Sequence, residues 1–144
     1  MIKEVTTYIL DEIGMAFWVR DVTFFVGHIP LKNKDGDDVA SMLRFAALLE
    51  TSPGATIPDL KDRVDQTFQI LNYNKSYFTA RDDAWAFYDL LHSSSQCDLP
   101  IIESGVELSA YIINAIGSPA PIENPDEKSR FVFSTNYLWM IGYR

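Results

Sequence analysis

The sequence of 144 residues contains one cysteine, two histidines and no long apolar run. The lone Cys97 cannot form an internal disulfide, and His28 and His92 do not have the H-x-x-x-H spacing that places two metal ligands on one helical face. The first ten residues carry charged and polar groups where a signal peptide has an apolar core. We therefore expect a cytosolic protein without membrane segments.

Basic residues are also scarce, with 12 of them against 20 acidic residues and a net charge of −8. This balance argues against a surface that neutralises nucleic-acid phosphates over a broad area, and leaves only a local basic patch open. Hydrophobic residues make up 47% and charged residues 22%, as in ordinary globular proteins, and the length fits one domain over residues 1–144. Aromatic residues stand out at 13%.

Residue sets that would predict an enzyme are missing. The glycines are scattered singly, so no phosphate-binding loop is predicted, and Ser93 to Ser95 lack the G-x-S-x-G turn that exposes a nucleophile. The aspartates around Gly36 do not have the glycine and glutamate positions of an EF-hand, which favours a solvated loop. Cys97 has no neighbouring cation beyond His92 to stabilise a thiolate. We predict no catalytic residue, no cofactor and no metal site.

The histidines and one acidic pair have structural interpretations instead. His28 falls in an apolar run and is expected to be partly buried, while His92 lies at a predicted helix end, where a cation interacts favourably with the helix dipole. Asp82 and Asp83 are expected in the first turn of the same helix, where negative charge offsets the exposed amide dipoles.

The hydrophobic pattern predicts a helix and then a strand near the amino terminus. Apolar residues three or four apart form one helical stripe, the residues between them are left to water, and Gly14 ends the helix. The stripe is Ile2, Val5, Ile9 and Ile13, and the water-facing residues are Lys3, Glu4, Thr7 and Asp11. Residues 22–29, VTFFVGHI, predict a strand that Pro30 closes, and residues 31–38 predict a charged loop.

Residues 39–54, VASMLRFAALLETSPG, admit two interpretations. Ala, Met and Leu favour a helix, which Asp37 or Asp38 could cap. The alternative is a strand over residues 40–50. In either case Thr51 to Gly54 predict a break, which Pro58 extends.

The second half predicts a helix among strands. Residues 63–73 alternate as a strand with one buried face, and residues 76–94 form the clearest helix, whose first turn a Thr79-x-x-Asp82 sequence could tie down. The buried stripe of that helix is Ala80, Ala84, Phe87 and Leu91. Residues 93–100 predict a polar link, and residues 106–112 alternate as a further strand. A proline-rich segment follows, which should lack ladder hydrogen bonds up to Arg130.

The chain closes on a strand over residues 131–143 with large apolar side chains on both faces. The order of elements predicts a single α+β domain: a mostly antiparallel sheet of four to five strands, with the amino-terminal helix and the central helix packed on one face. Two helices cover only one face, so the remaining apolar groups need either a loop or another subunit as cover. The candidate interface residues are Arg130, Phe133, Tyr137, Trp139, Tyr143 and Arg144.

Residues 25–54 combine a strand ending in a Gly27-x-x-Pro30 turn, a polar loop, and a strand closing in Glu50-Thr51-x-x-Gly54. The segment VDQTFQILNYNKSYFTARDDAWAFYDLL follows as a strand and a long helix, and PIENPDEKSRFVFSTNYLWM as a proline-rich loop and a last strand. In these features the chain resembles the tail terminator proteins, also called minor capsid proteins, of long-tailed bacteriophages. The chain lacks the family's usual arginine in the central strand and its Gly-Gly pair, so no contact list is carried over. The resemblance favours the strand at residues 40–50.

This resemblance implies a structural virion protein of the phage neck, made in the bacterial cytoplasm. Such proteins form a ring, here expected to have six copies, on the head-proximal end of the tail tube, where they stop tube growth and face the head connector. The implied partners are further copies, the tail tube protein, and a connector or stopper protein. Phage DNA passes through the ring without specific binding, which the acidic balance suits. The alternatives are another head-tail joining protein such as a stopper, an unrecognised enzyme, and a non-viral adaptor that captures a peptide on a sheet edge.

Overall fold

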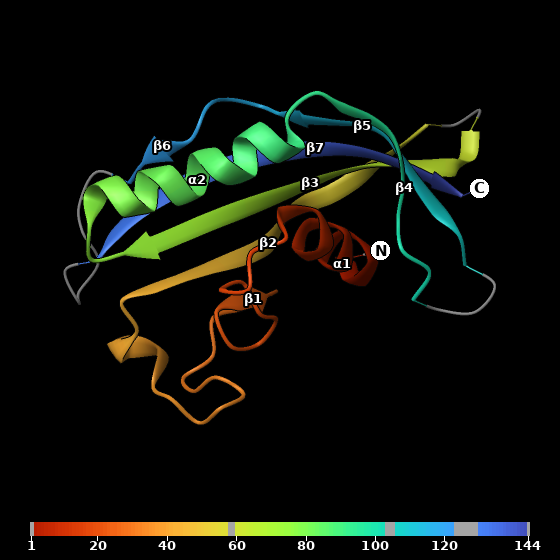
Figure 1. The fold of residues 1–144 in the computed structure, drawn as a ribbon. Helices are drawn as coiled ribbons and strands as arrows, with labels where there is room; N and C mark the ends of the chain where they lie inside the picture. Colours follow the sequence, from red (N-terminus) through yellow and green to blue (C-terminus); the bar gives the residue numbers. More distant parts are fainter. Residues whose placement is uncertain (1, 58–59, 103–105, 123–129, 144) are drawn as a thin grey trace.

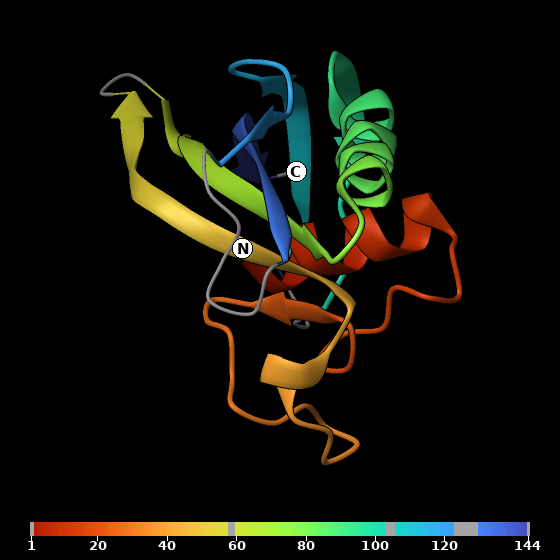
Figure 2. The same cartoon turned by 90° about the vertical axis from the view of Figure 1, so that its left-hand side faces the viewer.

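The computed structural model describes residues 2–57, 60–102, 106–122 and 130–143, and within residues 52–63 it describes the backbone only. Two helices lie on one face of a seven-stranded sheet (Figure 1, Figure 2). The elements are α1 (Ile2–Ile13), β1 (Phe24–Val26), β2 (Arg44–Ile57), β3 (Leu60–Asn74), α2 (Tyr77–Leu91), β4 (Ser94–Asp98), β5 (Leu108–Ala115), β6 (Ala120–Pro121) and β7 (Phe131–Tyr143).

The strand order is β1-β2-β3-β7-β5-β4, and β6 pairs with the first part of β7. All of these pairs are antiparallel except β1 with β2. The predicted α+β class is therefore confirmed, with more strands than the four to five expected. The two additional strands, β4 and β6, lie in segments whose polar or proline-rich composition predicted no strand.

Helix α1 has the predicted bounds, and Val5 and Ile9 on its apolar stripe are fully buried. Gly14 ends the helix with a φ of +59°, a conformation that glycine adopts without steric cost. The prediction that Glu4 faces water is wrong, because Glu4 is buried. Burial opposes its charged form, but a hydrogen bond to its own backbone N–H and the positive charge of Lys3 contribute to a pKa below the ordinary value.

Strand β1 is shorter than predicted. The chain leaves the sheet at Gly27, whose φ is +84°, and His28 is therefore exposed, not partly buried as expected. The ambiguous segment is a strand from Arg44 onward, preceded by a 3-10 turn over Val39–Ser41. The strand expected over residues 40–50 is therefore confirmed for residues 44–50 and wrong for residues 40–43.

The break predicted at residues 51–54 is not present. Strand β2 continues to Ile57, and its pairing with β3 shifts register between Glu50 and Ser52 and again between Ser52 and Ala55. These irregularities accommodate residues that a regular ladder would not, which is the usual role of a β-bulge. The distal part of the β2–β3 hairpin extends away from α2 (Figure 2). Pro58, predicted to extend a loop, lies outside the described residues.

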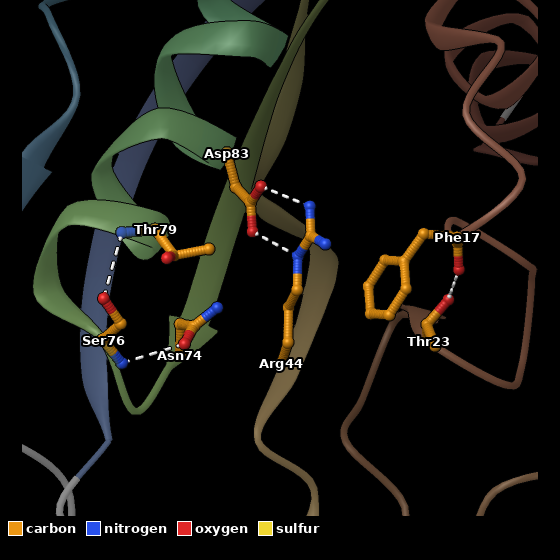
Figure 3. Close-up of polar contacts among 7 residues, drawn as sticks. All are labelled: Phe17, Thr23, Arg44, Asn74, Ser76, Thr79 and Asp83. Carbon is orange, nitrogen blue, oxygen red and sulfur yellow. Dashed lines mark hydrogen bonds and ion pairs between the residues drawn. The ribbon is translucent and has the colours of Figure 1, made fainter.

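Helix α2 buries its whole predicted stripe, but the predicted first-turn contact is wrong. Ser76 is the N-cap: its hydroxyl accepts a hydrogen bond from the N–H of Thr79 at 3.5 Å, and the Asn74 side-chain oxygen accepts one from the N–H of Ser76 at 2.9 Å (Figure 3). Because the helix starts at Tyr77, Asp82 and Asp83 lie in its second turn, not in its first.

Three predictions near the end of the chain need correction. The polar link contains β4, whose backbone pairs with β5 from Ser94 to Asp98. In β5 a register shift between Ala110 and Ile112 places Ile113 in the core and leaves Ile112 exposed, which simple alternation did not predict. Ala120 and Pro121 pair with β7, so the proline-rich segment does contain ladder contacts.

The main core lies between the sheet and the two helices, and a second cluster lies on the opposite face. The second cluster contains Phe25, Val39, Phe45, Ala47, Leu71 and Val132. The segment between β1 and β2 contributes to it through Val39 and Met42. A loop thus covers part of the second face of the sheet. This is one of the two alternatives, a loop or another subunit, expected for the apolar side chains that the helices do not cover.

Candidate interaction surfaces

The predicted interface rings lie in the core. Phe133, Tyr137 and Trp139 are buried on the helix-facing side of β7, and Trp139 makes edge contacts with the rings of Tyr8 and Phe68, both at 6.0 Å between centroids. Tyr137 and Trp139 pack with residues of α1 and α2, and Phe133 packs on α2, so these side chains are covered by the chain's own helices. The structure therefore assigns these three rings to the interior and not to an exposed surface.

Arg130 is buried as well, on the other face of the sheet. One guanidinium nitrogen donates hydrogen bonds to the carbonyl oxygens of Val39 at 2.9 Å and Met42 at 3.3 Å, and the guanidinium lies 4.9 Å from the ring centroid of Phe45. It holds the turn before β2 against the sheet. Of the remaining two candidates, Tyr143 is 55% exposed and Arg144 lies outside the described residues.

An ion pair that the sequence did not predict joins α2 to β2. The Arg44 guanidinium donates to both carboxylate oxygens of Asp83, with Nε–Oδ2 at 2.8 Å and a second nitrogen to Oδ1 at 2.6 Å (Figure 3). The guanidinium also lies over the rings of Phe17 and Trp18, at 4.2 and 5.2 Å from their centroids. The segment after α1 is held in place by the Thr23 hydroxyl, which donates to the Phe17 carbonyl oxygen (Figure 3).

The sequence contained a signal for this pair. Asp83 lies three residues after Ala80 and four before Phe87, so it belongs to the buried stripe of the helix, whereas Asp82 falls outside the stripe. The prediction that both aspartates lie in the first turn and offset its amide dipoles is wrong, because both lie in the second turn. Asp83 is buried against Arg44, and Asp82 is exposed.

Large apolar side chains are exposed where β3 ends and α2 begins. Phe78 is 74% exposed, Leu43 is 59% exposed, and Tyr77 beside them is also exposed. The backbone N–H of Lys75 donates to the Leu43 carbonyl oxygen at 3.1 Å, which brings the start of β2 to this place. Lys75 and Arg81 are exposed here as well. We call this surface the β3–α2 end, defined as Leu43, Lys75, Tyr77, Phe78 and Arg81.

A second exposed apolar cluster lies where β4 and β7 end and β5 begins. Ile101 is 56% exposed, and Ile102 and Tyr143 are also exposed. The N–H of Leu99 donates to the Leu108 carbonyl oxygen at 2.9 Å, and Leu108 pairs with Tyr143, so the three strand ends meet. Exposed Asp98 and Glu107 flank them. We call this surface the β4–β5 end, defined as Asp98, Ile101, Ile102, Glu107 and Tyr143.

A shallow hollow of about 230 Å³ lies beside β1 and the loop that follows it. Its lining residues are Asp21, Phe25, Val26, His28, Pro30, Lys32, Asn33 and Lys34. The Asn33 side-chain oxygen accepts hydrogen bonds from the N–H groups of Asp35 at 3.0 Å and Asp37 at 2.9 Å, so the aspartate-rich loop is organised by an amide.

Other polar groups have local roles. His92 accepts a hydrogen bond from the N–H of Ala115 at 3.1 Å and stacks on Tyr88. The Tyr8 hydroxyl donates to the sulfur of Cys97 at 3.2 Å; burial, followed by this contact, raises the pKa of Tyr8. Among the described residues, no three His, Cys, Asp or Glu side chains gather as a metal site would require.

No protein-family model and no curated protein matches the chain. Neither helix in the described part of the chain is long and apolar enough to cross a membrane.

Proposed function

We propose that this protein is a structural virion protein of the tail terminator type. It assembles as a ring of six copies on the head-proximal end of a phage tail tube, ends tube polymerisation, and presents its other side to the head connector. Phage DNA passes through the ring, and a protein with a net charge of −8 suits that role because like charge disfavours sticking.

The proposal that this protein assembles with other chains rests on its two exposed apolar clusters, the β3–α2 end and the β4–β5 end. The domain already has a core on each face of its sheet, yet Phe78, Leu43, Ile101 and Tyr143 each remain more than half exposed. Clusters of this kind, with a polar rim, are typical of surfaces that bind another chain. A protein that acts by adhesion needs such surfaces, whereas catalysis does not.

Residues 44–50 support the resemblance from which the terminator role comes. Local propensity favours a helix there, and the resemblance favours a strand; the segment is the first part of β2. The order of elements also agrees, since a strand and the long helix α2 follow β2, and a proline-rich segment leads into the last strand.

Tube assembly in vitro tests the proposal. The tail tube protein of the same phage would be polymerised with increasing amounts of this protein, and tube lengths would be measured on negatively stained electron micrographs. We expect shorter tubes with additional density at one end. Tubes of unchanged length with bare ends would contradict the terminator role.

Addition of the head connector to the same preparation separates the terminator from a stopper. A stopper would leave tube length unchanged and would co-sediment with the head connector instead of with the tube. An adaptor unrelated to phages would bind neither the tail tube nor the head connector.

A further inference from the structure

Three polar side chains are buried on the helix-facing side of β3 and β7 without a hydrogen-bond partner. Asn72 is 1% exposed, Thr135 is 2% exposed and Tyr137 is fully buried. Within the described part of the chain, both polar atoms of the Asn72 amide and the hydroxyl oxygens of Thr135 and Tyr137 make no hydrogen bond. Because a buried polar atom without a partner is costly, native proteins contain few of them.

The register of the sheet brings these side chains together. Asn72 pairs with Phe133 and Ile70 pairs with Thr135, so Asn72 and Thr135 are diagonal neighbours on one face of adjacent strands. Tyr137 follows Thr135 by two residues, which places it on the same face. Burial raises the pKa of Tyr137 and Thr135 opposes this effect, so the two side chains are close, although no hydrogen bond of ordinary geometry joins their hydroxyls.

A diagonal pair on the opposite face of the same two strands shows why Asn72 and Thr135 do not bond directly. The Gln69 side-chain nitrogen donates to the Ser134 hydroxyl oxygen at 2.7 Å. Diagonal neighbours in a sheet lie about 7–8 Å apart, a distance that long side chains can span. Asparagine is one methylene shorter than glutamine, so the Asn72 amide falls short of Thr135 and a gap separates two polar groups.

Helix α2 covers this part of the sheet with small side chains. Phe133, opposite Asn72, packs on Ala80 and Ala84, which are both fully buried. Asp83, a buried polar residue of this part of the helix, has both carboxylate oxygens engaged in its ion pair with β2. The helix therefore shields the polar side chains from solvent, but its own side chains do not satisfy them.

We infer that the Asn72 amide and the Thr135 hydroxyl hold an internal water molecule beneath α2, with Tyr137 as a third partner. Water fits because it both donates and accepts, as the amide and the hydroxyls do, and a buried water typically makes about three hydrogen bonds. The three side chains carry no formal charge to bind an anion. A bound cation such as Ca²⁺ needs about six or more oxygen ligands, and these side chains supply too few.

A crystal structure of the wild type tests the site directly. We expect an ordered water molecule within about 2.7–3.2 Å of a polar atom of Asn72 and of the Thr135 hydroxyl oxygen. A direct hydrogen bond between these two side chains, or a site in which neither of them contacts water, would overturn the inference.

Magnetic relaxation dispersion of water, which counts long-lived internal waters in solution, tests the role of each side chain. Asn72→Gln should lower the count by one, because the longer amide reaches Thr135 and fills the position of the water. Thr135→Val should also lower it by one, since valine has nearly the shape of threonine but no hydroxyl. A count that stays at the wild-type value in either variant would contradict the proposed site.

Gln69→Asn is the matched control. It makes the reverse change on the opposite face of the same strands, where Gln69 and Ser134 are partly exposed. Water there exchanges with the solvent, so the count should equal that of the wild type. Circular dichroism and the melting temperature show whether each variant is folded. Neither measurement depends on tail tubes, so this inference and the terminator role can each fail without the other.

Discussion

The pair of Arg44 and Asp83 gives the sharpest prediction about stability. The Arg44 side chain is 27% exposed and that of Asp83 is 9% exposed, and their two hydrogen bonds are short and parallel. Asp83→Asn keeps the shape of the side chain but removes the charge, which leaves the guanidinium over the rings of Phe17 and Trp18 without its counter-ion. Loss of one partner from a fully buried pair costs about 3–5 kcal/mol. Because Arg44 reaches some solvent, we expect about 2–3 kcal/mol.

Urea denaturation followed by tryptophan fluorescence would measure this change in the free energy of unfolding. In thermal denaturation, the melting temperature should fall by about 5–10 °C. The neighbouring Asp82→Asn is the matched control, since Asp82 is exposed; its effect should stay within about 0.5 kcal/mol. The double variant Arg44→Met, Asp83→Leu should recover part of the loss, because apolar residues often replace a buried ion pair at little cost. Equal stabilities of Asp83→Asn and Asp82→Asn would refute the assignment of the pair as a structural link.

Three further predictions concern the core, the helix cap and alkaline pH. Trp139→Ala should destabilise the protein by about 3–5 kcal/mol in urea denaturation, since the ring is fully buried, whereas Tyr143→Ala should change stability little. Ser76→Ala should cost about 0.5–1 kcal/mol in the same assay, because the N–H of Thr79 loses its side-chain acceptor. Burial raises the pKa of Tyr8 and Tyr137 above the ordinary 10, so stability should fall as pH rises above 10, and an ultraviolet titration should show at least two tyrosines that ionise later than in the unfolded chain.

The sign of the alkaline effect follows from linkage. A tyrosine whose pKa is raised by folding contributes stability that is complete below the unfolded value of about 10 and is lost above it. Tyrosines that all titrate together near the unfolded value in the folded protein would contradict the burial of Tyr8 and Tyr137. Similar losses for Trp139→Ala and Tyr143→Ala would contradict the assignment of β7 as a core strand with one exposed end.

Periodicity predicted the elements whose burial is one-sided. The stripe of α2 and the alternation of Phe68 and Ile70 in β3 were sufficient, because each element has one face packed on the main core. Alternation does not predict which side chains are buried where the pairing of two strands is irregular. The register shift in β5 buries Ile113 and exposes Ile112, the reverse of what alternation predicts, and the local sequence does not indicate the shift.

The exposed surfaces were harder to predict, because contacts between residues distant in the sequence determine which apolar side chains are covered. The apolar residues of β7 were expected to need a second subunit, but Trp139 and Tyr137 are covered by α1 and α2, and Val132 on the other face is covered by the segment before β2. β4 formed from a polar segment because β5 supplies backbone partners that composition does not reveal. The exposed ends likewise became visible only when strand ends far apart in the chain were brought together.

Electron cryomicroscopy of tail tubes assembled with this protein tests the central claim most directly. We predict a closed ring at one end of each tube, in which the β3–α2 end and the β4–β5 end of every copy are both buried. Tubes with bare ends, or isolated copies bound along the tube wall with both apolar ends exposed to solvent, would contradict the account.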